Sequence, residues 1–218
     1  ILEKYVHEKL PYLTRNLDYS IADIPPVALE SARAAIVGIA SLILTSMKDL
    51  VLASVPYQEI LKRIDDADDA LRYTGEFLAH VRSNPESAMD HEHNISILHS
   101  TEHLTRLAEA CREVETVRTT AHTPYLRQLA LDQLDSIDSS IMWLQGKKDE
   151  APTESVQHIS MMFAEIRKKM RTEMIDKIAR GEINPDNAFR LIEAMRWIDR
   201  LAYHVWRAIL HLSEFKEK

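Results

Sequence analysis

The sequence predicts an all-α protein of six long helices, arranged as two tandem antiparallel three-helix bundles. Apolar residues recur at intervals of three and four along most of the chain, which is the period of one face of an α-helix. The 218 residues include only 4 glycines, and no useful length of the chain alternates apolar and polar residues as a half-buried strand would. Helix-stopping prolines mark the five expected joints: Pro56, Pro85, Pro124, Pro152 and Pro185.

Composition and charge exclude several classes of protein. The formal net charge of −7 argues against a nucleic-acid binder. The single cysteine, Cys111, rules out an internal disulfide and fits a reducing compartment. Ile36 to Leu44 is apolar, but Arg33 and Lys48 bound it too closely for a membrane span, so we expect a buried helix. The chain does not open with methionine, and we expect it to be part of a longer protein.

The first half of the chain is expected to hold three helices whose apolar faces pack together. We expect a lead-in over residues 1–24 with a short helix from Leu2 to Leu10, a first long helix from Pro25 to near Val55, a second from about Tyr57 to Arg82, and a third ending at about Arg118. Short connections make consecutive helices antiparallel.

The second half is expected to repeat this pattern. The fourth helix follows Thr123-Pro124 and stops at Gly146, and the fifth follows Pro152 and closes at Gly181, since glycine often lies just past a helix C-terminus. The sixth helix follows the capping pair Asn184-Pro185. Its apolar seam contains no glycine or proline and consists of Leu191, Met195, Ile198, Ala202, Val205, Ile209 and Leu212.

The two tryptophans of the sixth helix cannot both face the same neighbour. Trp197 and Trp206 lie nine positions apart, which places them about 180° apart around a helix. We therefore expect at most one of them to be used at a partner surface, unless both are buried between the two units.

An internal repeat relates the third helix to the sixth. Residues 104–108 (LTRLA) resemble residues 198–202 (IDRLA), and the offset from Arg106 to Arg200 is 94 positions. The joints line up at a similar spacing, as in proteins built from duplicated helical units. We therefore divide the chain into the lead-in, a first three-helix unit over residues 25–120 and a second over residues 121–218.

Four segments, in this order along the chain, resemble a PhoU domain. They are Pro26 to Arg33 (PVALESAR), Leu98 to Leu107 (LHSTEHLTRL), Arg180 to Ala188 (RGEINPDNA) and Arg196 to His204 (RWIDRLAYH). PhoU domains are built from two three-helix bundles, with a signature in the third helix of each. The chain is similar in particular to the C-terminal cytoplasmic domain of bacterial sodium/phosphate cotransporter-family proteins.

The resemblance implies a regulatory or interaction domain that modulates phosphate uptake or phosphate signalling. It places the domain at the inner face of the bacterial plasma membrane. The implied partners are the transmembrane transporter portion of the same protein, upstream of the lead-in, and a sister domain or a signalling protein. The alternative is a stand-alone PhoU-type regulator of the phosphate regulon, or a metal-binding sensor.

The resemblance also implies a place for a metal, but the motif is degraded. Many PhoU proteins carry two acids four positions apart on the third helix of each unit, a spacing that puts both carboxylates on one face. The corresponding positions here are Thr105 with Glu109 and Asp199 with Tyr203, so each pair has lost one acid. We expect the iron or zinc cluster to be absent or weakened and expect no cofactor.

One further arrangement could hold zinc. His99 and His103 are four positions apart, and Glu102, Glu109 or His93 could complete a site. A packing role is favoured, because the chain has 10 histidines and such pairs arise easily. The candidate metal ligands are therefore Glu109, Asp199 and His103.

No catalytic arrangement is visible in the sequence. It contains no glycine-rich phosphate loop, and serine, histidine and aspartate residues are scattered without the context of a triad. Cys111 lies on an apolar seam and is expected to be a small buried residue rather than a nucleophile. The sequence therefore predicts a protein that is not an enzyme.

Overall fold

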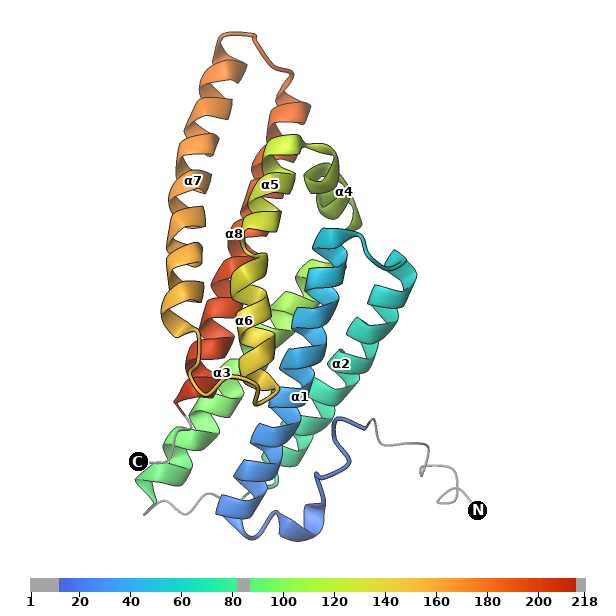
Figure 1. The fold of residues 1–218 in the computed structure, drawn as a ribbon, viewed down its shortest axis with the longest axis vertical. Helices are drawn as coiled ribbons and strands as arrows, with labels where there is room; N and C mark the ends of the chain where they lie inside the picture. Colours follow the sequence, from blue (N-terminus) through green and yellow to red (C-terminus); the bar gives the residue numbers. More distant parts are fainter. Residues whose placement is uncertain (1–11, 82–86, 215–218) are drawn as a thin grey trace.

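The computed structural model describes residues 12–81 and 87–214, and within these residues every regular element is a helix (Figure 1). The elements are the 3₁₀-helix η1 (Tyr19–Ile21) and the α-helices α1 (Pro25–Leu52), α2 (Tyr57–Leu78), α3 (Ala88–Cys111), α4 (Val114–His122), α5 (Pro124–Asp132), α6 (Leu134–Leu144), α7 (Thr153–Ala179) and α8 (Pro185–Ser213). The all-α prediction is confirmed. The short helix expected from Leu2 to Leu10 and the expected cap Asn84-Pro85 lie outside the described residues.

The third predicted helix is wrong in its extent, because the chain breaks at Arg112 and Glu113 into α3 and α4. Side chains from other helices take the carbonyls at the end of α3. The Tyr57 hydroxyl donates to the Cys111 carbonyl over 3.0 Å, and Trp197 Nε1 donates to the Ala110 carbonyl over 2.8 Å. These bonds satisfy groups that a helix end leaves unpaired, so α3 ends here without a glycine or proline.

The fourth predicted helix is also wrong as a single element, since Gln133 separates α5 from α6. Gln133 has φ −84° and ψ −10°, away from the helical ψ near −42°. The Ser136 hydroxyl donates to the Gln133 carbonyl over 2.7 Å. Hydroxyl-to-carbonyl bonds of this kind compete with the helical ladder and bend it.

Several expected helix ends agree with the structure, and two starts do not. Gly146 and Gly181 have φ of 68° and 72°, the left-handed conformation that favours glycine. Asn184 accepts from the Asp186 amide over 2.8 Å, as a cap should. Thr123 makes no cap bond and donates instead to the Thr119 carbonyl. The third helix begins at Ala88, beyond the expected joint at Pro85, and is capped by Ser87.

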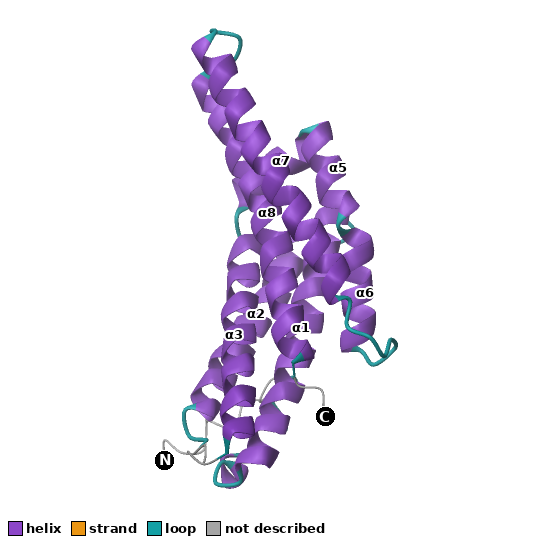
Figure 2. Ribbon diagram, turned by 90° about the vertical axis from the view of Figure 1, so that its left-hand side faces the viewer, coloured by secondary structure: helices purple, strands orange, loops and turns teal. Residues whose placement is uncertain are grey.

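The apolar seams form one connected core. The seam of α8 is buried from Met195 to Leu212, with Leu191 partly buried at its outer end. Two helices organise the packing: α1 contacts α2, α3 and α6, whereas α8 contacts α7, α3 and α4. The α7–α8 pair extends beyond the other helices at one end of the molecule (Figure 2). α6 contacts α1 more extensively than it contacts α7, which leaves α6 and α7 apart along much of their length.

Among the described residues, α1 is the one helix long and apolar enough to cross a membrane by length and composition. Half of its most apolar window is buried inside the structure. The stretch from Ile36 to Leu44 lies in the middle of α1, and Ile36, Ile39 and Ile43 are fully buried among the other helices. The apolar character of α1 thus follows from its central position.

We expect Gln133→Leu to stabilise the protein by about 1–3 kcal/mol, the desolvation cost of a buried polar group without a partner. Gln133 is 1% exposed, and neither atom of its side-chain amide has a hydrogen-bond partner. Leucine has a similar size and removes this cost. The free energy of unfolding in urea measures the effect. Gln157→Leu on the exposed face of α7 is the control, and an equal change in both variants would show that Gln133 is not special.

Candidate functional site at the α3–α8 interface

The two helices that carry the PhoU-like signatures pack directly against each other. α3 and α8 contact each other along much of their length, and the contacts follow opposite orders in the two helices. Ser96 bonds Glu214 near the start of α3, His103 meets His204 in the middle, and Ala110 bonds Trp197 at the end. α3 and α8 are therefore antiparallel, and their signatures meet at the centre of the interface.

Four histidine side chains lie together in this interface, which we call the histidine row: His99 and His103 from α3, and His204 and His211 from α8. His99 stacks on His211 with ring centroids 4.9 Å apart, and His103 is parallel to His211 at 5.8 Å. His103 Nδ1 and His204 Nδ1 are 3.0 Å apart, so one ring donates its proton to the other. This bond joins the middle of α3 to α8.

Burial controls the protonation of the central pair. Desolvation lowers the pKa of His103 to about 4, with smaller contributions from His204, His211 and Arg207. Desolvation likewise lowers the pKa of His204 to about 4, and Arg200 and Arg106 act in the same direction. Both rings are therefore neutral near pH 7, and each can donate or accept a single hydrogen bond through Nδ1.

The outer end of the histidine row is tied to the end of α8. His211 Nδ1 lies 3.1 Å from a Glu214 carboxylate oxygen, and the same oxygen accepts from the Ser96 hydroxyl over 2.7 Å. Arg207 lies 3.1 Å from the other ring nitrogen of His211. Both nitrogens of His211 are thus already occupied by protein groups.

The structure separates the candidate metal ligands. Glu109 is exposed on α3 and pairs with Arg106 at 2.9 Å. Asp199 is largely buried and pairs with Arg167 of α7 at 2.7 Å. His103 points toward His204 rather than toward either acid. Each of the three candidates is therefore engaged with a different protein group.

The two positions that lack an acid do not supply other ligands. The Thr105 hydroxyl donates to the Thr101 carbonyl within α3, and Tyr203 is 42% exposed with its ring edge against His103. Within residues 12–81 and 87–214, no three histidine, cysteine or acidic side chains gather closely enough to hold a metal ion. These residues do not fit the iron or zinc cluster found in PhoU proteins.

Tertiary contacts that sequence reasoning missed surround the histidine row. Nη2 of Arg200 in α8 donates to both carboxylate oxygens of Glu113 at 2.6 and 2.7 Å, and such charge-assisted bonds are stronger than neutral ones. On α2, Asp65 and Asp68 pair with Arg112 at the end of α3. Spacing along one helix could not indicate these partners, because each pair joins different helices.

Cys111 is fully buried at the end of α3, as its place on the seam predicts. Burial raises the pKa of its thiol to about 12. The thiolate is the nucleophilic form of cysteine, so Cys111 acts as a packing residue.

Compared with family models, curated proteins and solved structures, the chain gives no match in any of the three. The resemblance to PhoU domains therefore depends on the four sequence segments and on what the geometry of α3 and α8 adds to them.

Proposed function

We propose that the chain is a cytoplasmic PhoU-like regulatory domain of a sodium-dependent phosphate cotransporter-family protein, built from two related three-helix units. In this proposal the domain carries out no reaction and holds no metal cluster. It modulates phosphate uptake or phosphate signalling through helix contacts with the transmembrane portion of the protein, a sister domain or a signalling protein.

The observation that carries the proposal is a symmetry in the contacts between α3 and α8. The sequence repeat relates positions 94 apart. The contact between His103 and His204 becomes, under this offset, a contact between Trp197 and Ala110, which is the contact observed at the end of α3. The exchange requires that the two helices be antiparallel and meet at matching positions of the repeat, and two copies of one unit packed around a twofold axis would meet in this way.

The ion pairs of the two remaining acids favour an interaction domain over a metal sensor. The acids that remain from the family motif, Glu109 and Asp199, each have an arginine partner. A cation entering this region would have to displace Arg106 and Arg167 as well as water. A rigid pair of signature helices instead positions the surfaces of the two units relative to each other.

Phosphate uptake in the native cell tests the proposal. Residues 25–213 are deleted in frame from the gene that encodes this chain, and sodium-dependent uptake of labelled phosphate is measured in phosphate-replete and phosphate-starved cells. We expect uptake to persist but to lose its response to phosphate supply. The exposed substitution Asp66→Asn on α2 serves as control and should behave as wild type. Uptake that is independent of sodium, or regulation that survives the deletion, would refute the proposal.

A further inference from the structure

The α7–α8 pair carries two matching rows of exposed side chains on its outer side. Residues seven positions apart return to nearly the same face of an α-helix. The rows, which we call the outer rows, are Met161, Lys168 and Ile175 on α7, and Phe189, Arg196 and Tyr203 on α8. All six residues are exposed, and the four apolar or aromatic ones are between 42% and 61% exposed. Each row thus holds one cation between two large side chains that face solvent.

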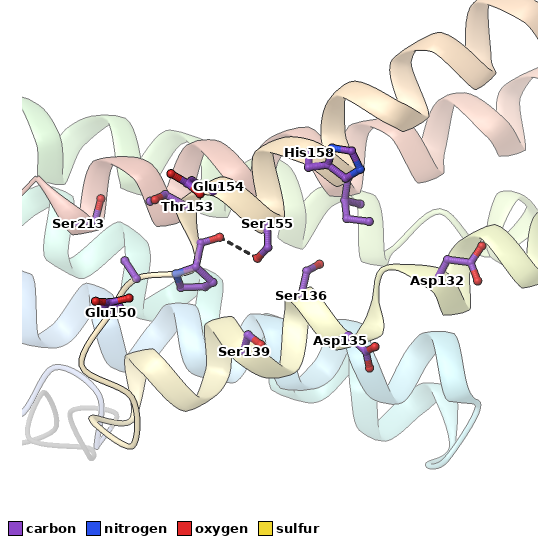
Figure 3. A pocket seen from close by; sticks show the side chains of 13 residues that line it. Asp132, Asp135, Ser136, Ser139, Glu150, Thr153, Glu154, Ser155, His158 and Ser213 are labelled. Atoms are coloured by element: carbon purple, nitrogen blue, oxygen red, sulfur yellow. Dashed lines mark hydrogen bonds between the residues drawn. The ribbon is translucent and has the colours of Figure 1, made fainter.

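Both outer rows face away from the rest of the molecule. On α7, Ser155 lines the open groove between α6 and α7 (Figure 3), and Ile175 lies 20 positions further on, about 200° around the helix. On α8, Ile198 and Val205 are buried in the core, and the outer row runs two positions before them, again about 200° away. The inner neighbours of the pair are α6 on the side of α7, and α1 and α5 on the side of α8.

The two rows lie level with each other along the pair. α7 and α8 are consecutive helices joined by a short loop, residues 180–184, and they run antiparallel (Figure 1). The ion pair between Arg167 and Asp199, at 2.7 Å, fixes how the two helices are aligned. In this alignment each member of one row lies within one helical turn of its counterpart in the other row. The two cations therefore lie at one level, with a pair of apolar or aromatic side chains on either side of them.

The net charge of the α7–α8 pair is opposite in sign to that of the rest of the chain. Residues 153–213 contain 10 lysines and arginines and 8 aspartates and glutamates, which gives +2. The whole chain carries −7, so the remaining residues carry −9. Lys168 pairs with Glu165 at 2.6 Å and Arg196 with Glu193 at 3.7 Å, and both acids are exposed on the same helix as the cation. Exposed pairs of this kind contribute little, so the cations can turn to another anion.

We propose that the outer rows dock the chain on the surface of a bilayer that contains anionic lipids. Lysine and arginine are attracted to the anionic headgroups, while aromatic and aliphatic side chains beside them enter the boundary between headgroups and acyl chains. A second copy of the chain fits this surface less well, because a twofold interface brings the same patch of both copies together and sets the cations of one row pair against their equivalents. The inference goes beyond the regulatory role proposed above and does not depend on it, because purified chain and vesicles test it without phosphate uptake.

Cosedimentation of the purified chain with vesicles tests the inference in about 0.1 M salt, where charges more than about 10 Å apart are screened. We expect binding to vesicles of phosphatidylcholine with about one third phosphatidylglycerol, and no binding to phosphatidylcholine alone. Lys168→Gln combined with Arg196→Gln should weaken binding at least about tenfold, because these cations supply the attraction to anionic lipid. Lys62→Gln combined with Arg127→Gln, at exposed positions on α2 and α5, gives the same net charge and should bind as wild type does.

A fluorescent reporter keeps the test decisive if the charge variant loses stability. Phe189→Trp places an indole in the outer row of α8, and brominated lipids in the anionic vesicles should quench its added fluorescence. Tyr125→Trp on α5, where the native side chain is 55% exposed, is the control and should not be quenched. Failure of the wild-type chain to bind anionic vesicles, equal losses in the charge variant and its control, or equal quenching of the two reporters would each overturn the inference. Binding to a glutamate-rich peptide or to a second copy of the chain, without binding to vesicles, would also overturn it.

Discussion

Trp197→Ala is expected to lower the free energy of unfolding by about 4 kcal/mol or more, the largest effect of a single substitution in this chain. Trp197 is 1% exposed and packs where α8 meets the end of α3. Its removal leaves a cavity in the core. It also removes the buried hydrogen bond from the indole N–H to the Ala110 carbonyl, and the loss of this bond adds a further cost.

Urea unfolding followed by circular dichroism measures this effect. Trp206→Ala is the matched control, because Trp206 lies on the same helix, is only partly buried and has Arg207 5.5 Å from its ring centre. We expect the control to lose about 1 kcal/mol, the contribution of an exposed cation–π contact with modest burial. Equal losses in the two variants would contradict the central position of Trp197.

The contrast between these tryptophans shows what helical periodicity can predict. The spacing in sequence predicts that the two rings face opposite directions, and the structure buries one and leaves the other partly exposed. The same reasoning places Ile36 and Ile198 in the core, where both are fully buried. A period of 3.6 residues is a local property, so the sequence carries it without knowledge of the neighbouring helices.

The two helix breaks show where such reasoning stops. Neither the end of α3 nor the joint at Gln133 contains a glycine or a proline. The end of α3 depends on donors from Tyr57 and Trp197, which are 54 and 87 positions away from their acceptors. A local pattern holds no information about bonds between distant segments, and tertiary contacts override it.

The candidate site was predictable in its location but not in its chemistry. The repeat directed attention to the third and sixth predicted helices, and these helices do pack together as α3 and α8. The sequence placed His99 beside His103 but did not show that His204 and His211 would pack against them, because those two belong to another helix. It also did not reveal that Asp199 would be paired with Arg167.

The histidine row leads to the second large prediction, a loss of stability on acidification. The pKa values of His103 and His204 fall from 6.5 to about 4 on folding, mainly through desolvation. Between these values the unfolded chain binds protons that the folded chain does not, so the free energy of unfolding decreases as the pH falls from 6.5 toward 4. In the folded state, protonation of the accepting Nδ1 atom also breaks the hydrogen bond between the two rings, because a protonated nitrogen cannot accept.

We expect protonation of the pair to lower the free energy of unfolding by about 3 kcal/mol over this range. One pKa unit corresponds to about 1.4 kcal/mol, and the interaction between the two sites is shared by both. The charged and polar groups around the pair come from both helices: Glu102, Arg106, Glu109, Arg200, Tyr203, Arg207 and His211. Asp68 and Asp199, whose pKa values are raised mainly by burial, act in the opposite direction at the acid end.

Comparison of variants separates the histidines from these carboxylates. In His103→Asn with His204→Asn, the amides keep polar atoms near the positions of the two Nδ1 atoms but do not titrate. Between pH 4 and 6.5, the free energy of unfolding in urea should therefore change less with pH than in wild type. The difference between the two slopes is the contribution of the pair. His91→Asn on the exposed face of α3 should keep the wild-type slope. If the double variant is as acid-sensitive as wild type, the buried pair does not control stability in acid. The sensitivity would then come from the arginines and acids that surround the pair at the α3–α8 interface.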